Sequence, residues 1–175
     1  MKKIIFLLCL SISGVMVAQE KTYHQEVLEY FVINGTANQY SNATTGLFDL
    51  LKKQYASSNV PASVWSELEG ESSQAVERIL NMLVSAYRGS YSQQNIQEMS
   101  AFYSTATGRQ ILTDRSGMTA EQQNEAAAFY NTATGQTILD SEQKIGKNIS
   151  EISEIWSRDL YRMMVDKLAE KGYTI

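Results

Sequence analysis

The residues of this chain that could do catalytic chemistry are few and widely spaced. His24 is the only histidine among the 175 residues, and no cysteine or acidic residue stands at ligand spacing from it. A zinc site needs three or four protein ligands, and a hydrolytic triad needs a nucleophile that is paired with a base. We therefore predict no metal site, no cofactor and no histidine-based catalysis.

Carboxylates, or a serine paired with a lysine, are the groups left for hydrolysis. Glu67, Glu69 and Glu71 alternate along the chain, so their side chains would point apart on a helix. Glu121 and Glu125 would share one helix face, where like charges repel. Both sets are typical of solvated helix surfaces, and a carboxylate-dependent hydrolase is the third and least favoured of our functional hypotheses.

Aromatic residues offer a better case for binding. A Phe-Tyr pair opens an eleven-residue phrase that occurs twice, as FYSTATGRQIL at 102–112 and as FYNTATGQTIL at 129–139. Tyrosine combines apolar area with a hydroxyl group and is enriched at protein interfaces. The candidate binding surface consists of Tyr87, Tyr91, Tyr103, Arg109 and Tyr130. The alternative is that these tyrosines are half-buried core residues.

Each phrase has the pattern of a corner between two helices. A polar, helix-favouring run precedes each copy, and Thr105 and Thr132 then stand where a side chain can cap a new helix. Gly108 and Gly135 follow inside that new helix, where glycine costs roughly 1 kcal/mol relative to alanine. We expect a neighbouring helix to approach closely at each glycine, with each phenylalanine in the core and each tyrosine partly solvated.

The remainder of the chain also has helical patterns. Proline occurs once, glycines are sparse, and no segment alternates as a strand would. The spacing of apolar residues predicts a helix over 23–33, a second from a cap at Thr36 to about Tyr55, and a third from Pro61 to the stretch 88–90. Another helix is capped by Ser92, and the last runs from about 133 to 171. We predict an all-α fold, a bundle of about six or seven helices with a duplicated helical corner and a long C-terminal helix.

Two of these helices have apolar faces that can be assigned from spacing. In the second helix we expect an inward face of Tyr40, Leu47, Leu50, Leu51 and Tyr55. The last helix carries a stripe of Ile138, Ile145, Ile149, Ile152, Trp156, Leu160, Met163 and Leu168. A stripe of this length must be covered by several shorter helices, and we expect the two corners to lie against it.

The first residues have the pattern of a secretory signal peptide. Lys2 and Lys3 precede an apolar run from Ile4 to Val17, which is shorter than the ~20 residues that span a bilayer. Ala18 is the expected last residue before cleavage, and an uncleaved anchor helix is the alternative. The predicted organisation is a signal peptide at 1–18 and a single helical domain at 19–175, exported to the periplasm or the outside, with no membrane span in the mature chain.

Composition narrows the classes of partner. Cleavage would remove Cys9, the only cysteine, so the mature protein would have no disulfide and no thiolate. It would also remove two of the 15 basic residues and leave 13 against 19 acidic ones, a net charge of −6. No basic cluster remains beyond Lys52 and Lys53, which argues against nucleic acid or an anionic membrane surface as the partner.

These residues resemble a known family, the secreted bacterial proteins that carry domain of unknown function 2059. The residues that carry the resemblance are Tyr87, Tyr91, Ser92, Phe102, Tyr103, Thr105, Gly108 and Arg109, followed in the tail by Trp156 and Lys171 to Tyr173. The resemblance extends over roughly Val27 to Tyr173. It implies an α-helical, exported protein and no settled activity.

The chain departs from the family pattern at four positions. Ala106 and Ala133 stand where the family usually has proline, and Gln136 and Thr137 leave the second copy without a basic residue after its glycine. Any function that the basic residue serves would therefore belong to Arg109 and the first copy alone.

The function that these observations favour is binding without catalysis. We expect an interaction or envelope-associated module with a protein partner of unknown identity in the cell envelope. The alternative is a carrier that holds a small apolar ligand between its helices. The sequence does not specify an oligomeric state.

Overall fold

The computed structural model describes residues 21–174, so the predicted signal peptide lies outside the described residues. The described chain contains seven α-helices and no strand, which confirms the all-α prediction. The helices are α1 (Tyr23–Ile33), α2 (Thr36–Gln54), α3 (Ala62–Arg88), α4 (Gln93–Tyr103), α5 (Ala106–Thr113), α6 (Ala120–Tyr130) and α7 (Ala133–Glu170). Two short 3-10 turns, η1 (Ala56–Ser58) and η2 (Arg115–Gly117), follow α2 and α5.

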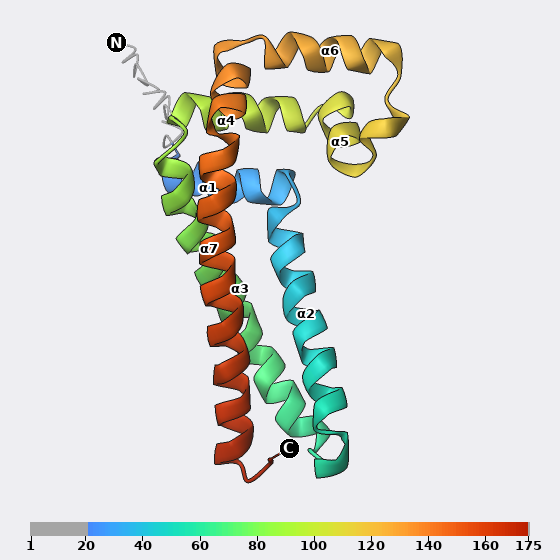
Figure 1. Cartoon of the computed structure of the whole chain (residues 1–175), viewed down its shortest axis with the longest axis vertical. Helices are drawn as coiled ribbons and strands as arrows, with labels where there is room; N and C mark the ends of the chain where they lie inside the picture. The colour runs from blue at the N-terminus through green and yellow to red at the C-terminus, as the bar shows by residue number, and fades with distance from the viewer. Residues whose placement is uncertain (1–20, 175) are drawn as a thin grey trace, which may run out of the picture.

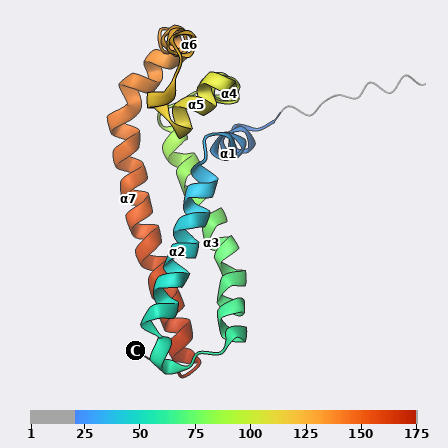
Figure 2. The same cartoon turned by 90° about the vertical axis from the view of Figure 1, so that its right-hand side faces the viewer.

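The helices form two parts, which we call the stalk and the head. The stalk consists of α2, α3 and α7, which run lengthwise side by side (Figures 1 and 2). The head consists of α1, α4, α5 and α6, which lie across one end of the stalk (Figure 1). The C-terminal ends of α1 and α3 and the first turns of α7 meet in the head, so this is where distant parts of the chain come together.

The long terminal helix is covered differently from our expectation. It packs chiefly along α3, and the two corners contact only its N-terminal end. With a rise of 1.5 Å per residue, the 38 residues of α7 span about 57 Å and the 27 residues of α3 about 40 Å. The eight-residue α5 spans about 12 Å, too little to cover such a stripe. The prediction that the corners cover α7 is therefore wrong, because only another long helix can do so.

Aromatic residues connect the three stalk helices. The indole N–H of Trp156 donates a hydrogen bond to the Ala75 carbonyl of α3 at 2.9 Å. The Trp156 ring meets Tyr40 of α2 edge to face, with 5.3 Å between ring centroids. The Tyr40 hydroxyl in turn lies 2.6 Å from the Ser153 hydroxyl of α7. These three polar side chains of the stalk core thus have partners, as buried polar groups require.

The buried face of α2 agrees only in part with the predicted one, and Leu47 packs half-buried against the core. Tyr40, Leu51 and Tyr55 are buried as expected, but Leu50 is 48% exposed and Phe48 is buried. Buried Thr44 completes the row, whose members recur every three or four residues. The prediction for Leu50 was wrong because it followed hydrophobicity rather than the phase of the helix.

The two phrases form corners with the same local geometry. Thr105 caps α5 by accepting a hydrogen bond from the Gly108 N–H at 3.0 Å, and Thr132 caps α7 in the same way with Gly135 at 3.1 Å. Both caps were predicted, and both are confirmed. In each corner the chain ends one helix and begins the next within three residues.

The glycines allow the two helices of each corner to touch. A Cβ atom on Gly108 would stand 2.2 Å from the Phe102 carbonyl oxygen, and one on Gly135 would stand 2.3 Å from that of Phe129. The expected close approach is therefore confirmed, and the helix that approaches is the one directly before the corner. Tyr130 is partly exposed, as predicted, but Tyr103 is buried and both phenylalanines are only half-buried, so the predicted burial was wrong for these three residues.

We predict that Gly108→Ala and Gly135→Ala each lower the free energy of unfolding by about 1–3 kcal/mol or more, because backbone atoms would have to move. Urea unfolding followed by circular dichroism would measure this change. Gly146→Ala in α7 is the matched control, since a Cβ there meets nothing within 4 Å. The control should gain about 0.5–1 kcal/mol from helix propensity. Unchanged stability of both corner variants would contradict the close-packing explanation.

Candidate functional site

Five tyrosines form a continuous row through the head. Successive ring centroids lie 5.4 Å apart from Tyr91 to Tyr87, 5.9 Å from Tyr87 to Tyr30 and 6.1 Å from Tyr30 to Tyr103. The row ends with Tyr130, whose hydroxyl lies 3.0 Å from that of Tyr103. These centroid distances are typical of attractive aromatic pairs. We call these five residues the tyrosine row.

The row is assembled from segments far apart in the sequence. Tyr30 comes from α1, Tyr87 from the last turn of α3, and Tyr91 from the connection to α4. Tyr103 and Tyr130 are the last residues of α4 and α6, and the corner after each sets its position. The position of the row therefore depends on how the two corners are packed.

One wall of a surface pocket is made by the tyrosine row. This tyrosine pocket has a volume of about 540 Å³, within the range of roughly 300–1,000 Å³ that is usual for ligand sites. Its other lining residues are Met99, Ile138, Leu139 and Ile145, which are apolar, and Arg115 and Glu142, which are charged. Leu139 is 49% exposed, so an apolar side chain stands at the solvent side of the pocket.

The structure brings four members of the predicted binding surface together and places the fifth elsewhere. Tyr87, Tyr91, Tyr103 and Tyr130 all line the tyrosine pocket, whereas Arg109 does not. The Arg109 guanidinium donates to the Ser104 carbonyl at the end of α4, so it supports the first corner.

Sequence reasoning missed Tyr30, Arg115 and Glu142, which also line the pocket. Helical spacing from Val27, which was predicted to face inward, could have identified Tyr30. Arg115 and Glu142 each stand three residues after the last leucine of a phrase, so they hold equivalent positions of the repeat. This equivalence could have identified them as a pair.

Burial raises the pKa of four of the tyrosines in the row. It raises the pKa of Tyr30, Tyr87 and Tyr103 well above the usual value near 10, and the hydrogen bond to Tyr130 raises the pKa of Tyr103 further. Burial also raises the pKa of Tyr91, and the negative charge of Glu142 adds to this effect. At neutral pH the pocket therefore offers apolar ring surface and hydroxyl groups, without a phenolate nucleophile or base.

Equivalent aromatic residues of the two phrases pack on each other. The rings of Phe102 and Phe129 are stacked, with centroids 3.9 Å apart and planes 5° from parallel. Tyr103 and Tyr130, the next residue of each phrase, meet through their hydroxyls. Contact between identical positions is what a two-fold axis produces in a symmetric dimer.

Hydroxyl–carboxylate hydrogen bonds cross between the copies in the same reciprocal way. Thr134 of the second phrase donates to Glu98 of α4 at 2.5 Å, and Thr107 of the first phrase donates to Glu125 of α6. Both threonines are only 2% exposed. The bond from Thr134 lowers the pKa of Glu98, and one from Gln94 adds to this shift, so the carboxylate is ionised at neutral pH. The two corners thus hold each other in place and fix the middle of the tyrosine pocket.

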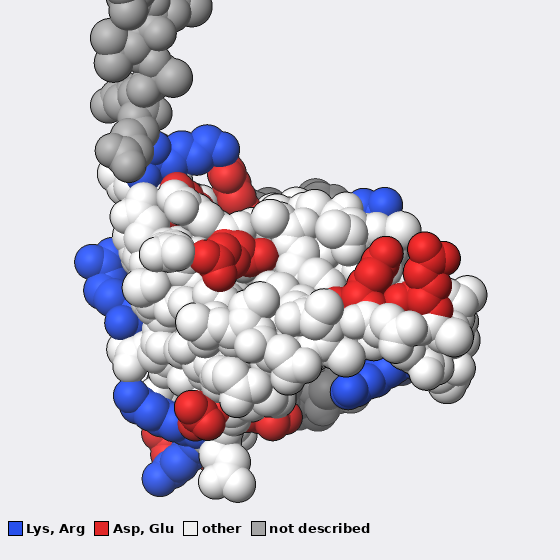
Figure 3. Space-filling view, turned by 90° about the horizontal axis from the view of Figure 1, so that it is seen from above, with Lys and Arg blue, Asp and Glu red and all other residues white. Residues whose placement is uncertain are grey.

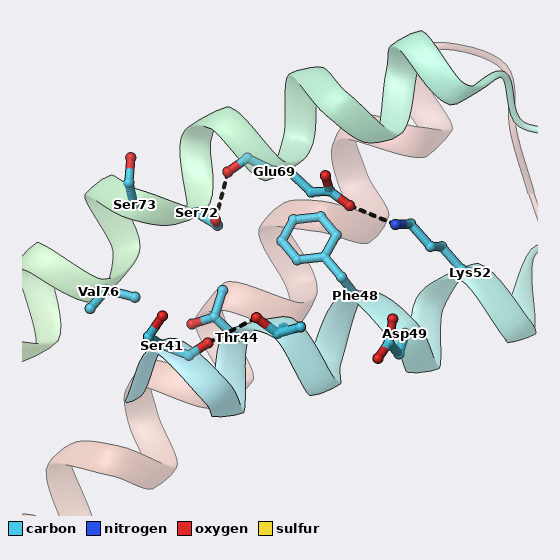
Figure 4. Close-up of a pocket in the computed structure, with 10 residues that line it drawn as sticks. Ser41, Thr44, Phe48, Asp49, Lys52, Glu69, Ser72, Ser73 and Val76 are labelled. Atoms are coloured by element: carbon cyan, nitrogen blue, oxygen red, sulfur yellow. Dashed lines mark hydrogen bonds and ion pairs between the residues drawn. The ribbon is translucent and has the colours of Figure 1, made fainter. Parts of the chain in front are cut away.

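A second pocket of about 540 Å³ lies in the stalk between α2 and α3 (Figure 4). Its polar groups are mostly engaged within the protein. Thr44 donates to the Tyr40 carbonyl at 2.8 Å, and Ser72 donates to the Glu69 carbonyl at 2.6 Å. Lys52 pairs with the Glu69 carboxylate at 2.6 Å (Figure 4). Since these donors already have partners, the tyrosine pocket is the better candidate for a binding site.

The described residues, 21–174, contain neither a metal-binding cluster nor a membrane-spanning helix. No cluster of three or more histidine, cysteine, aspartate or glutamate side chains is arranged there to hold a metal ion. None of the helices in this range combines the length and apolarity needed to cross a bilayer. Viewed from above in Figure 3, the described surface is mostly uncharged, and its acidic and basic side chains stand in small separate groups.

Part of the chain matches a known family model. Residues 77–124 match the family model described as "Uncharacterized protein conserved in bacteria (DUF2059)". This segment contains Tyr87, Tyr91, Tyr103, Arg109 and the whole first phrase, and it ends before Tyr130. It supports the resemblance to this domain family over a shorter span than the expected Val27 to Tyr173. No curated protein and no solved structure matches the chain.

We predict that the buried tyrosines ionise only when the protein unfolds. Above pH 10 the unfolded chain releases phenol protons that the folded chain retains, so stability falls with rising pH by roughly 1.4 kcal/mol per pH unit for each such tyrosine. Absorbance at 295 nm and circular dichroism, recorded together in an alkaline titration, measure the two events. The signal of Tyr30, Tyr87 and Tyr103 should appear with the loss of helix. Complete phenolate absorbance in a fully helical protein would contradict this prediction.

Proposed function

We propose that this protein is an exported, non-catalytic binding module that holds a segment of a partner protein in the tyrosine pocket. One observation carries the proposal. Tyrosines from α1, α3, α4, α6 and the connection before α4 meet in one pocket of about 540 Å³.

The chemistry of the pocket supports binding over catalysis. Its walls combine aromatic rings and aliphatic side chains with hydroxyls that can donate or accept hydrogen bonds, the combination found at the centres of protein interfaces. Neutral phenols and two exposed charged groups do not make a nucleophile–base pair. Exposed Leu139 gives a partner an apolar contact at the solvent side of the pocket.

Export is part of this proposal. It is supported by Lys2 and Lys3, the apolar run from Ile4 to Val17 and the small residue Ala18, and by the resemblance to a secreted family. The two phrases, on this view, are copies of one corner that pair with each other.

A small-molecule carrier is the second candidate. The pocket volume and the apolar wall of Met99, Ile138 and Ile145 favour it, because a drug-sized apolar molecule needs a cavity of this size. Native mass spectrometry of the protein recovered from its own cells separates the candidates. A bound species of a few hundred daltons supports the carrier, whereas a protein complex supports the interaction module. In either case the exported chain should begin at Gln19.

Recovery of the partner with a pocket variant tests the interaction directly. We expect Leu139→Glu to reduce recovery of a partner from envelope extract by about tenfold, because a charge would enter an apolar contact. Leu112→Glu is the matched control. Leu112 holds the equivalent position of the first phrase and is similarly exposed, at 42%, but it does not line the pocket. Equal recovery of every protein by the two variants would contradict the proposed contact site.

A further inference from the structure

The reciprocal packing of the two phrases creates two related grooves in the head. In the tyrosine pocket, Met99 of α4 faces Ile138 and Glu142 of α7. A smaller pocket of about 320 Å³ has Ala126 of α6 with Ile111 of α5 and Arg115 of η2. The residues of the two pockets hold equivalent positions in the two copies of the repeat. Ala126 corresponds to Met99, Ile111 to Ile138 and Arg115 to Glu142.

The two grooves join, because Arg115 and Tyr130 line both of them. Their equivalent charged positions carry opposite signs, with an arginine in one copy and a glutamate in the other. Because the two charges are opposite in sign, a ligand with one basic and one acidic end would bind in one orientation.

These two charges stand at the two ends of the tyrosine row. Lys144, two residues after Glu142, donates to the carbonyl of Gly89, two residues before Tyr91, so this part of α7 lies at the Tyr91 end of the row. The charge of Glu142 accordingly acts on the Tyr91 phenol. Arg115 shares both grooves with Tyr130, the last member. The rings of Tyr87, Tyr30 and Tyr103 lie between them.

Both charged groups are available to a partner. Arg115 and Glu142 are exposed, and neither forms an ion pair or a side-chain hydrogen bond with another residue of the described range. Lys144, two residues after Glu142, donates instead to the Gly89 carbonyl at 2.9 Å. The nearby Glu98 and Glu125 are held by Thr134 and Thr107.

We propose that the segment bound in the tyrosine pocket carries a basic side chain at the Glu142 end, apolar side chains along the tyrosine row, and an acidic side chain at the Arg115 end. This inference rests on the proposed function and adds the charge pattern of the partner. Charge complementarity distinguishes such a segment from a purely anionic or purely cationic ligand, because either of these would face a like charge at one end.

Short peptides test the charge pattern without knowledge of the natural partner. The probes are acetylated and amidated peptides in which one, two or three leucines separate a lysine from a glutamate. Each is compared with versions in which glutamine replaces the lysine, the glutamate or both. Affinity is measured by calorimetry on the mature full-length protein, for wild type, Glu142→Gln and Arg115→Gln.

We expect at least one Lys–Leu–Glu spacing to bind wild type, and each neutralised peptide to bind about two- to fivefold more weakly, the effect of an exposed ion pair. In Glu142→Gln, replacing the lysine of the peptide should no longer change the affinity, whereas replacing its glutamate should still weaken binding. In Arg115→Gln, only replacement of the lysine should weaken binding. Glu121→Gln and Lys147→Gln remove the same charges from exposed positions outside the pocket and should change nothing.

The remaining outcomes separate this inference from the proposed function. Equal affinity for charged and doubly neutral peptides would overturn the charge pattern and leave the apolar binding site in place. The charge pattern would also be overturned if the two control variants lost as much affinity as the pocket variants. The net charge of the protein, rather than the two pocket residues, would then explain the data. Failure of every peptide to bind would overturn the charge pattern. Equal partner recovery by Leu139→Glu and Leu112→Glu in addition would overturn the proposed function as well.

Discussion

The structure depends on the way in which two similar corners hold each other. Thr107 and Thr134 are buried inside helices and donate to Glu125 and Glu98 of the opposite copy, while Phe102 stacks on Phe129. A buried hydroxyl without a partner is costly, so each copy supplies what the other needs. A single corner would leave a buried threonine and a phenylalanine face uncovered. The second corner supplies both contacts.

The stalk and the head contribute differently to the structure. In the stalk, α3 and α7 cover each other over several turns, and Trp156 and Tyr40 fix their register with α2. The head brings chain segments that are far apart in the sequence together at one end of the stalk. Because the paired corners orient Tyr103 and Tyr130, they also determine the shape of the tyrosine pocket and the separation of its two charged groups. The geometry of the site is therefore a consequence of how the corners pair.

Local signals in the sequence predicted most helix limits. Capping residues such as Ser92, Thr105 and Thr132, and the spacing of apolar residues, act within one or two turns and can be read without tertiary structure. The errors concern contacts between distant elements. Leu50 was assigned inward although Phe48 faces the core, the corners were placed along α7 although α3 covers it, and Tyr103 is buried deeper than Phe102. The role of Arg115 and Glu142 appears only once the two copies are seen to face each other.

Double-mutant cycles on the hydroxyl–carboxylate pairs test the central claim most directly. Unfolding free energies are measured for Glu98→Gln, Thr134→Val and the double variant, and likewise for Glu125→Gln with Thr107→Val. Reciprocal pairing predicts that each double variant loses less stability than the sum of its single variants, whereas Glu98→Gln with Thr107→Val is additive. Additivity in both cross-copy cycles, or coupling only between residues of the same copy, would contradict this account of the head.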